Sequence, residues 1–475
     1  MKHSIIIILF LSASTTAKAQ LWEQVGGPEW WGAGAMYSDT LTNSLYIGGI
    51  FLWPGDTVRG IFRYDGNEWE TVAAFDKYSS FDWRGALTRY QGKIIYGGYF
   101  RLFDDVFPTN IAAWNGTGWE PMGATSEGLL WGPVHAFYDW QGSLVVGGQV
   151  IYVDSVRVDG IARWDGSEWD PLGTDMFLDA FNREVTAIEE YHGELYMGGR
   201  ITMSVPGPFS PHSYGLAKWD GEKWKPVGYG GLGPWSPICG ISSVNALATF
   251  QGELYIGGCF PLLPVYEPGT NFPIATALVK WNGTEYRALG AEEPYVIDMV
   301  VFNEELYVVG EFDSHSEVGE TNVFKWDGSR WCSLGSIFNG PIHHIGIHNG
   351  ELYVSGGFTH INGEPFRGVV KWVGGDYTAA CGTPVATDEP LPKRDGFVIS
   401  PNPAGEKISL SFSNPIFQKN TNLKVFDTLG HIVFKKNNLK NIDGYIIEVS
   451  SWPPGVYFMN MEVDGQAWTK KIIIQ

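Results

Sequence analysis

The chain has 475 residues, of which 44% are hydrophobic and 18% charged, and it carries a formal net charge of −20. This length allows two or three domains with large cores, and the hydrophobic content argues against a disordered chain. The excess of acidic residues excludes nucleic acid and anionic membranes as favoured partners, because both repel a negative surface.

Residues 1–19 are expected to be a secretory signal peptide. Lys2 precedes the apolar run Ile5–Leu11, and Ala17-Lys18-Ala19 supplies the small residues of a cleavage site before Gln20. This run is too short to span a bilayer, and no later run reaches the required length. We therefore expect an exported protein without a transmembrane helix.

Residues 20–381 contain an internal repeat. The phrase "GELYMGG" (193–199) returns as "GELYIGG" (252–258), and each copy is followed by a second phrase such as "AKWDGEKWKPVG" (217–228). Seven copies occur at a period near 50 residues, and each contains four strand-like segments with tight glycine turns between the first and second and between the third and fourth. Such a repeat predicts an all-β fold, a seven-bladed β-propeller with one copy per blade.

The repeat resembles the kelch family, in which a hydrophobic strand ends in Gly-Gly and is followed by an aromatic-Asp pair and then a tryptophan. Here Trp-Asp-Gly stands where Tyr-Asp is commoner in kelch repeats. The resemblance implies that the first strand of each blade is innermost and the fourth outermost. We expect a side chain at Gly198 or Gly199 to crowd the neighbouring blade. The segment "LWEQVG" (21–26) is an eighth copy of the outermost strand, so we expect it to complete the seventh blade.

Four cysteines follow the expected signal peptide, which permits two disulfides in an oxidising compartment. Cys239 with Cys259 is the favoured pair, because both fall at the same end of one blade. Cys332 with Cys381 is a second possible pair, on a terminal segment displaced from the repeat. The spacing of these cysteines does not match a metal site.

The C-terminal part of the chain departs from the repeat. Residues 382–395 are rich in proline and are expected to form a linker, and residues 396–475 alternate apolar runs with turns, as in a small β-sandwich. The segment resembles the type A C-terminal sorting domain of the type IX secretion system. The residues that carry this resemblance are Pro401, Asn402, Pro403, Gly430, Gly455, Tyr457, Lys470 and Lys471. The resemblance implies export to the periplasm, recognition by the type IX machinery, passage across the outer membrane, and then removal of the domain or anchoring at the surface.

The loops between the second and third strands and between successive blades vary in length, and they share one face of the predicted propeller. Function on a rigid scaffold usually lies on such loops. Several aromatic residues there fall outside the repeat positions: Trp31, Trp53, Trp83, Trp131, Trp235 and Tyr295. Exposed aromatic faces suit stacking on sugar rings or apolar ligands, whereas buried ones would be blade packing.

Two histidines, His135 and His343, are further candidates for ligand binding, because they align at the start of the innermost strand, on the variable face. The other five copies have Met36, Gly85, Thr186, Asn245 and Ile297 there, so no ring of metal ligands forms. The carboxylates Asp82, Glu184 and Glu293 lie near the same loops and are candidates for acid–base chemistry, but their spacing selects no pair. The sequence therefore indicates no metal, no cofactor and no defined catalytic set.

The sequence thus predicts a seven-bladed kelch-like propeller followed by a small sandwich, secreted or held at the outer cell surface. We interpret it first as a binding module whose variable face takes a glycan or protein ligand. A glycan-active lyase or hydrolase on the same face is one alternative. A structural or adhesive surface protein is another.

Overall fold

The structure is a computed structural model. It describes residues 21–26, 29–53, 56–75, 84–100, 110–122, 132–150, 152–153, 156–173, 183–203, 213–228, 232–233, 235–236, 240–266, 273–289, 295–311, 321–382, 397–400, 404–412, 421–428, 430–439, 444–463 and 466–475. Within these ranges the regular secondary structure consists of strands, and none of them contains a helix long and apolar enough to cross a membrane. The predicted signal peptide and linker lie outside the described residues, except for Gly382 at the start of the linker.

Between residues 22 and 381, the described residues form seven antiparallel sheets of four or five strands. We name each sheet after its innermost strand. In chain order, the strands of the first four sheets are β2 (Glu29–Asp39), β3 (Ser44–Trp53), β4 (Asp56–Tyr64) and β5 (Trp69–Ala74); β6 (Ala86–Tyr90), β7 (Lys93–Gly97), β8 (Ile111–Trp114) and β9 (Trp119–Pro121); β10 (Val134–Trp140), β11 (Ser143–Gly148), β14 (Ile161–Trp164) and β15 (Trp169–Pro171); and β16 (Arg183–Tyr191), β17 (Glu194–Met203), β18 (Ser213–Trp219) and β19 (Trp224–Pro226).

The strands of the remaining three sheets are β22 (Ser243–Phe250), β23 (Glu253–Tyr266), β24 (Pro273–Trp281) and β25 (Tyr286–Ala288); β26 (Tyr295–Phe302), β27 (Glu305–Glu311), β28 (Val323–Trp326), β29 (Trp331–Ser333) and β35 (Ala380–Cys381); and β30 (Ile342–His348), β31 (Glu351–Gly356), β34 (Val369–Trp372) and β1 (Trp22–Gln24). Short two-stranded sheets join β12 (Tyr152–Val153) to β13 (Val156–Arg157), β20 (Trp235–Ser236) to β21 (Gly240–Ile241), and β32 (His360–Ile361) to β33 (Glu364–Pro365).

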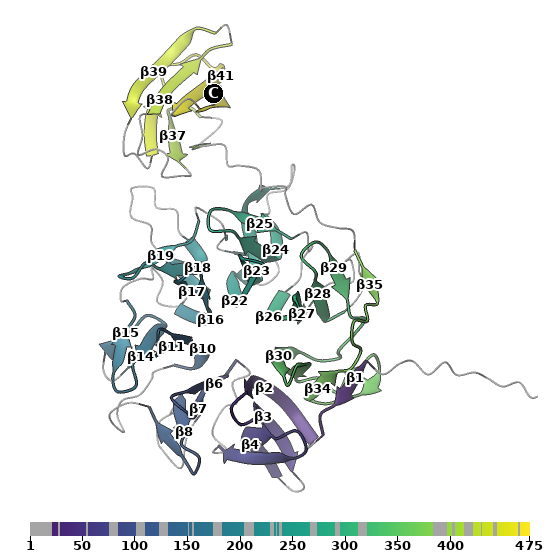
Figure 1. The fold of residues 1–475 in the computed structure, drawn as a ribbon. Helices are drawn as coiled ribbons and strands as arrows, with labels where there is room; N and C mark the ends of the chain where they lie inside the picture. Colours follow the sequence, from purple (N-terminus) through teal and green to yellow (C-terminus); the bar gives the residue numbers. More distant parts are fainter. Residues whose placement is uncertain are drawn as a thin grey trace, which may run out of the picture.

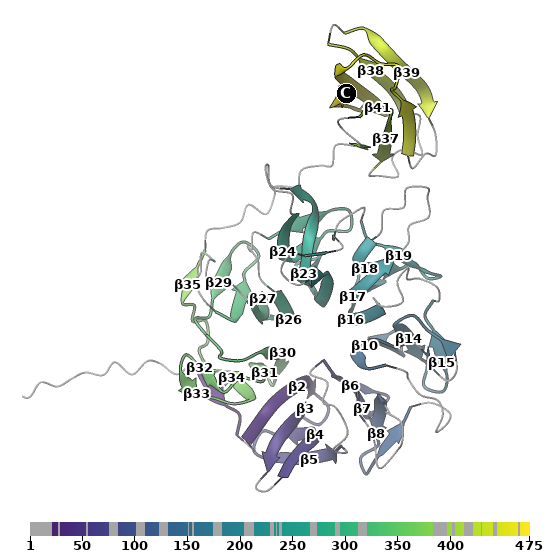
Figure 2. The same cartoon turned by 180° about the vertical axis from the view of Figure 1, so that it is seen from behind.

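The seven sheets follow one another around a ring, with β2, β6, β10, β16, β22, β26 and β30 nearest its centre (Figures 1 and 2). In each sheet the chain runs outward through consecutive antiparallel hairpins, as the tight turns predict. The arrangement is a β-propeller, and the order of strands from the centre outward is the one expected from the repeat.

The N-terminal strand completes the last sheet, as the eighth copy of the outer segment predicts. β1 pairs with β34, and Trp22 lies opposite Trp372. The Trp22 side chain is 2% exposed, its indole Nε1 donates to Ser336 Oγ at 2.8 Å, and its ring meets Phe338 edge-on. The start of the propeller segment is therefore joined to the strand β34 near its end, which closes the ring.

Glycines at the end of the second strand allow the sheets to pack closely. A Cβ placed on Gly198 would lie 2.5 Å from Cγ1 of Val244 in the next sheet, and one placed on Gly199 would lie 1.9 Å from the Glu184 carbonyl oxygen. A side chain at Gly198 would thus crowd the neighbouring sheet, as expected, whereas one at Gly199 would clash with β16 of its own sheet, so the expectation was wrong for Gly199. Contacts of 2.5–2.7 Å between sheets recur at Gly97, Gly147 and Gly257.

Each of the seven sheets carries a cross-strand ion pair near its short turns. The pairs are Arg63–Glu70, Lys93–Glu120, Arg163–Asp170, Lys218–Glu194, Lys280–Glu253, Lys325–Glu305 and Lys371–Glu351. The acid comes from the outermost strand in the first three sheets and from the second strand in the last four. The repeat thus conserves the ion pair as a structural unit while exchanging the strand that supplies the carboxylate.

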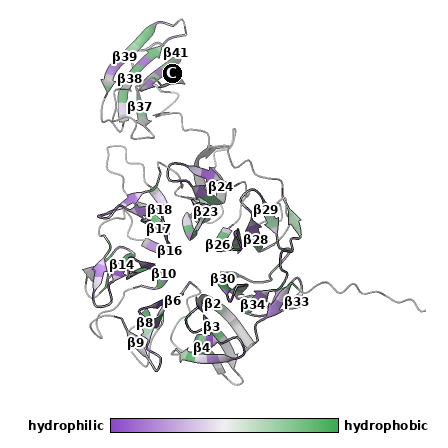
Figure 3. Ribbon diagram, in the orientation of Figure 1, coloured by the Kyte–Doolittle hydropathy of each residue, from purple (hydrophilic) through white to green (hydrophobic). Residues whose placement is uncertain are grey.

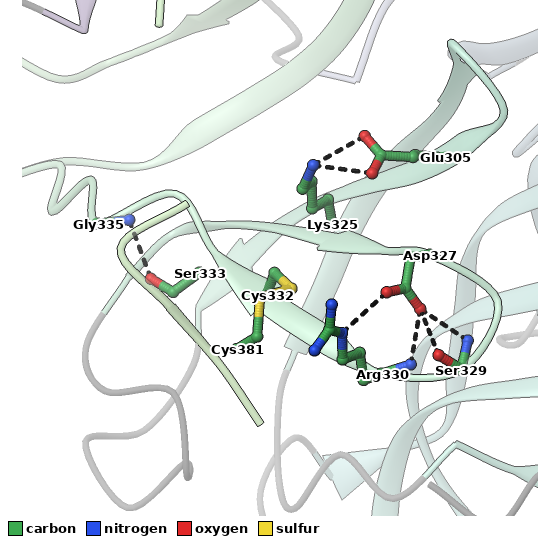
Figure 4. Close-up of a disulfide and its surroundings, with 9 residues drawn as sticks. All are labelled: Glu305, Lys325, Asp327, Ser329, Arg330, Cys332, Ser333, Gly335 and Cys381. Carbon is green, nitrogen blue, oxygen red and sulfur yellow. Dashed lines mark hydrogen bonds and ion pairs between the residues drawn. A yellow bond between two sulfur atoms is a disulfide. The ribbon is translucent and has the colours of Figure 1, made fainter. Parts of the chain in front are cut away.

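One of the two possible disulfides is seen in full (Figure 4). Cys332 and Cys381 are bonded, and β35 adds a fifth strand to the β26 sheet by pairing with β29. The suggested displacement of the terminal segment is therefore confirmed. Cys259 is also disulfide-bonded. Its expected partner, Cys239, lies outside the described residues.

The C-terminal segment forms two sheets that share one core. The strands are β36 (Phe397–Ser400), β37 (Lys407–Phe412) and β40 (Gly444–Glu448) in one sheet, and β39 (Ile432–Leu439), β38 (Thr421–Phe426), β41 (Gly455–Val463) and β42 (Gln466–Ile474) in the other. Buried Leu423 and Val425 alternate with partly exposed Asn422 and Lys424 along β38. Figure 3 shows the strands of this segment with both hydrophobic and hydrophilic residues. Leu423 and Val425 pack in one cluster with Ile408 of the facing sheet, as in the predicted sandwich.

Candidate binding site at the inner strands

The structure distributes the predicted aromatic residues over several elements of the variable face. Trp31 lies in β2, Trp53 ends β3 opposite Asp56, and Trp235 lies in the short strand β20. Tyr295 begins β26 opposite Glu311, and its side chain is half-buried. Trp83 and Trp131 lie outside the described residues, as do the carboxylates Asp82 and Glu293. A ligand-binding role for these residues stays a prediction.

Five innermost strands have a register shift at the position that the two histidines occupy. The extra residue is His135, Thr186, Asn245, Ile297 or His343. Such a β-bulge re-aims one side chain out of the regular ladder. In this ring four of the re-aimed side chains, all but Ile297, contact a neighbouring sheet.

Three of these side chains bond to the backbone of the following sheet. Thr186 Oγ1 donates to the Val244 carbonyl at 2.5 Å, and Asn245 Nδ2 donates to the Val296 carbonyl at 2.7 Å. His343 Nδ1 lies 2.7 Å from the Ala33 carbonyl of the first sheet. The acceptor is always the residue just before the irregularity in the next strand, so the repeat places donor and acceptor together.

His343 is a neutral hydrogen-bond donor in this setting. Burial, which penalises the charged form, lowers its pKa to about 4, against the favourable effect of the Ala33 carbonyl. A carbonyl oxygen only accepts, so Nδ1 carries the proton. This contact gives His343 a structural role between the last and first sheets, and within the described residues no cluster of three potential metal ligands occurs.

The sheet that carries Ile297 uses the following residue instead. The Ile297 side chain cannot donate, and Asp298 Oδ2 accepts from the Ile345 backbone N–H at 3.1 Å and lies 3.2 Å from His344 Nδ1. The polar link between neighbouring inner strands is therefore kept with reversed polarity. The contact between β26 and β30 therefore comes from the residue one position after the bulge.

His135 belongs to a different arrangement, a charged cluster of Arg84, His135, Glu184 and Arg200, which we name the Glu184 cluster. Glu184, at the start of β16, is 4% exposed. Its Oε1 lies 2.5 Å from Arg84 Nη1 and 3.4 Å from His135 Nε2, and its Oε2 lies 3.8 Å from Arg200 Nε. The cluster joins three consecutive sheets, at the end of the inner strands where the variable loops begin.

The cluster sets two guanidinium groups beside one buried carboxylate. The Arg84 and Arg200 side chains are 42% and 40% exposed, whereas the Glu184 side chain is 5% exposed. The positive groups therefore reach solvent while the negative group stays inside.

Arg200 and His135 both lie within ion-pair distance of Glu184. The Arg200 Nε atom is buried and makes no hydrogen bond to any described residue. His135 lies between two groups, since its Nδ1 is 3.3 Å from the Arg84 carbonyl oxygen and its Nε2 is 3.4 Å from Glu184 Oε1. Both guanidinium groups of the cluster are thus partly exposed, whereas the imidazole and the carboxylate are buried.

Sequence reasoning named Glu184 and His135 but missed both arginines. Arg84 directly follows Trp83 in a loop, and Arg200 directly follows the paired glycines of the second strand. The one feature of the sequence that could have pointed to them is a basic residue beside a variable loop in each of these two repeat copies. Their convergence on one carboxylate depends on the ring arrangement of the sheets.

In the C-terminal sandwich, the described residues of the sorting pattern have structural positions. Gly430 has a positive φ of 85° in the turn before β39, and Gly455 begins β41. The Tyr457 hydroxyl donates to the Pro453 carbonyl at 2.7 Å. Lys470 and Lys471 lie in β42, and Lys471 is exposed. Pro401, Asn402 and Pro403 lie outside the described residues.

Solved structures similar to this chain share little sequence with it. The β-propeller domain of the Trilobed protease from Pyrococcus furiosus is 9% identical over 78% of this chain and 100% of its own, with a TM-score of 0.38. The polysaccharide lyase Uly1 is 12% identical over 76% of this chain and 93% of its own, with a TM-score of 0.37. Trypanosoma rangeli sialidase is 10% identical over 95% and 88%, with a TM-score of 0.33. These values assign no activity to this chain, and among curated proteins no sequence matches it.

The C-terminal segment does match a family model. Residues 398–475 match the secretion system C-terminal sorting domain, over the same two sheets that form the sandwich. This agrees with the order of the sorting residues along the segment. Residues 398–475 are thus a C-terminal sorting domain, which marks this β-propeller protein for type IX secretion to the cell surface or beyond it.

Proposed function

We propose that the protein is an extracellular binding module that recognises an acidic glycan, with the Glu184 cluster as the recognition point. One observation carries this proposal: two partly exposed guanidinium groups converge on one buried carboxylate. A guanidinium group binds a carboxylate or sulfate through paired hydrogen bonds, so Arg84 and Arg200 suit the acidic groups of uronates and sulfated sugars.

The overall charge sharpens this recognition. The chain has 52 acidic and 32 basic residues, so most of its surface repels polyanions. Binding of an acidic glycan would therefore depend on direct contacts with Arg84 and Arg200 and not on general attraction. The negative surface therefore favours a specific ligand over the alternative of a structural or adhesive surface protein.

The support of His135 favours binding over catalysis. A general base must reach the proton it removes, at about 2.6–3.2 Å or through one water. The Nε2 of His135 is buried and faces Glu184, and its Nδ1 faces a backbone carbonyl. The imidazole acts here to position Glu184, so the lyase or hydrolase alternative lacks its base in this cluster.

The aromatic residues of the variable face extend the proposed site. Trp31, Trp53, Trp83, Trp131, Trp235 and Tyr295 would supply flat faces on which the sugar rings stack while the arginines hold the acidic groups. With this site we also propose seven blades of kelch type and export by a signal peptide at residues 1–19.

A panel of acidic polysaccharides tests the ligand class. Alginate, polygalacturonate, heparin and a sialylated oligosaccharide are each compared with a counterpart whose acidic groups are esterified or removed. We expect the full-length secreted protein to bind at least one acidic member, more weakly at higher ionic strength, and to bind its neutral counterpart at least tenfold more weakly. Equal binding of both members of every pair would contradict the proposal.

A further inference from the structure

A groove lies beside the short turns, at the end of the inner strands opposite the Glu184 cluster. It runs between the β10 and β16 sheets and has a volume of about 400 Å³. Trp140 and Gln141 line it from the end of β10, Arg163 and Asp170 from the outer strands of the same sheet, and Glu194 and Trp219 from the β16 sheet. We name it the β10/β16 groove. Its volume falls in the range of small-molecule sites.

The preceding pair of sheets has an equivalent but smaller groove of about 270 Å³. There Tyr90 and Gln91 take the positions of Trp140 and Gln141. The Tyr90 hydroxyl donates to the Gly142 carbonyl of the next sheet at 3.0 Å, and a Cβ placed on Gly166 would lie 2.5 Å from Gln91 Nε2. These two side chains therefore bridge this groove.

The β10/β16 groove lacks both bridges. Trp140 has no hydroxyl to reach the next sheet, and a Cβ placed on Gly221, the position equivalent to Gly166, would meet no described atom within 4 Å. The sheets still keep a fixed spacing here, because Trp224 Nε1 donates to the Leu172 carbonyl across the junction at 2.6 Å. The groove thus results from the missing bridging side chains and not from a wider separation of the two sheets.

The walls of the groove offer donors and acceptors beside aromatic rings. Arg163 pairs with Asp170, with side chains 36% and 50% exposed, so donor and acceptor stand together at the rim. Glu194, 40% exposed, adds a second carboxylate, which Lys218 holds at 2.8 Å. The Trp219 ring is half-buried and braced by Trp224 at 5.4 Å between centroids. Adjacent hydroxyls of a pyranose can both donate to and accept from such a rim, and the apolar face of the sugar can stack on the Trp219 indole.

The charges of the groove favour a neutral ligand. Each of its three carboxylates, of Asp170, Glu194 and Asp220, already has a cation beside it: Arg163, Lys218 and Lys225. An acidic sugar would have to compete with these carboxylates for their cations, whereas a neutral sugar would use the carboxylates as hydrogen-bond acceptors. From this geometry we infer that the β10/β16 groove is a second binding site, for a neutral sugar unit, on the face opposite the Glu184 cluster. It is independent of the proposed acidic-glycan site.

Titration with neutral sugars tests the groove. Glucose, galactose, mannose, fucose and N-acetylglucosamine, free and as short oligomers, are titrated into the full-length protein and followed by calorimetry and saturation-transfer NMR. We expect at least one to bind. Trp140→Tyr, which restores the hydroxyl found at Tyr90, should close the groove and weaken binding at least tenfold. Asp170→Asn removes a charged acceptor and should weaken binding by about tenfold.

A matched control comes from the repeat itself. Glu70 forms the equivalent ion pair with Arg63 in the β2 sheet, so Glu70→Gln should leave sugar binding unchanged. Replacement of Arg84 and Arg200 by glutamine should also leave it unchanged. The inference is overturned if no neutral sugar binds, if Trp140→Tyr and Asp170→Asn bind as well as the wild type, or if the arginine variant loses neutral-sugar binding.

Discussion

The Cys332–Cys381 disulfide gives a prediction whose size follows from the chain. The bond closes a loop of 49 residues that contains β30, β31 and β34, the three strands that β1 completes into the last sheet. Closing a loop of this length removes about 4 kcal/mol of conformational freedom from the unfolded chain. The propeller segment from Trp22 to Cys381 has about 360 residues. The unfolding entropy is roughly 2.1 cal/mol/K per residue, so removal of the disulfide should lower the melting temperature by about 5 °C.

The assay is differential scanning calorimetry of the wild type and of the double variant Cys332→Ala and Cys381→Ala. A variant is preferable to a reducing agent, because reduction would also open the disulfide that holds Cys259. Circular dichroism checks that the variant keeps its sheets. A melting temperature within 1 °C of the wild type would refute the reasoning, since it would mean that β1 alone restricts the last sheet.

Three further predictions concern closure of the ring by β1, the pH dependence of stability, and export by the sorting domain. Trp22→Ala should lower the free energy of unfolding by about 3–5 kcal/mol in denaturant titration, whereas Glu23→Ala, on an exposed position of the same strand, should cost under about 1 kcal/mol. The lowered pKa of His343 means that the unfolded chain binds more protons between pH 6.5 and 4, so this residue should remove about 3 kcal/mol of stability as pH falls to 4. His343→Asn, which keeps a donor for Ala33, should show less of this loss in unfolding titrations at both pH values; an identical loss would show that other groups cause it. A chain without residues 398–475 should stay in the periplasm in cell fractionation, and its appearance outside the cell would contradict the role of the sorting domain.

Much of the fold could be predicted from the sequence, because the repeat makes each sheet a copy of the others. The hairpin turns, the close packing at Gly198 and the closure by residues 21–26 all follow from aligning the copies. The pairing of Cys332 with Cys381 was only one possibility, because it depends on where the terminal segment runs. The sheet that this segment joins depends on the path of the chain in three dimensions, which the repeat pattern does not specify.

The candidate sites were harder to predict. A β-bulge turns His135 and His343 toward neighbouring sheets, and a strand pattern read from sequence assumes regular alternation. The alignment found the shared position of the two histidines but not that it joins sheets. The convergence of Arg84 and Arg200 on Glu184 brings together residues up to 116 positions apart. The β10/β16 groove depends on the absence of a hydroxyl at Trp140, a difference that matters only once Tyr90 is seen to bridge its own groove.

The comparison that tests the central claim most directly is binding of the best acidic glycan by the wild type and by the double variant Arg84→Gln and Arg200→Gln. Arg63→Gln, which removes an equally partly exposed cation from the ion pair with Glu70, serves as the control. We predict a loss of at least tenfold in affinity for the double variant and no change for the control. Unchanged binding by the double variant, with its fold intact, would contradict the assignment of the Glu184 cluster as the binding site.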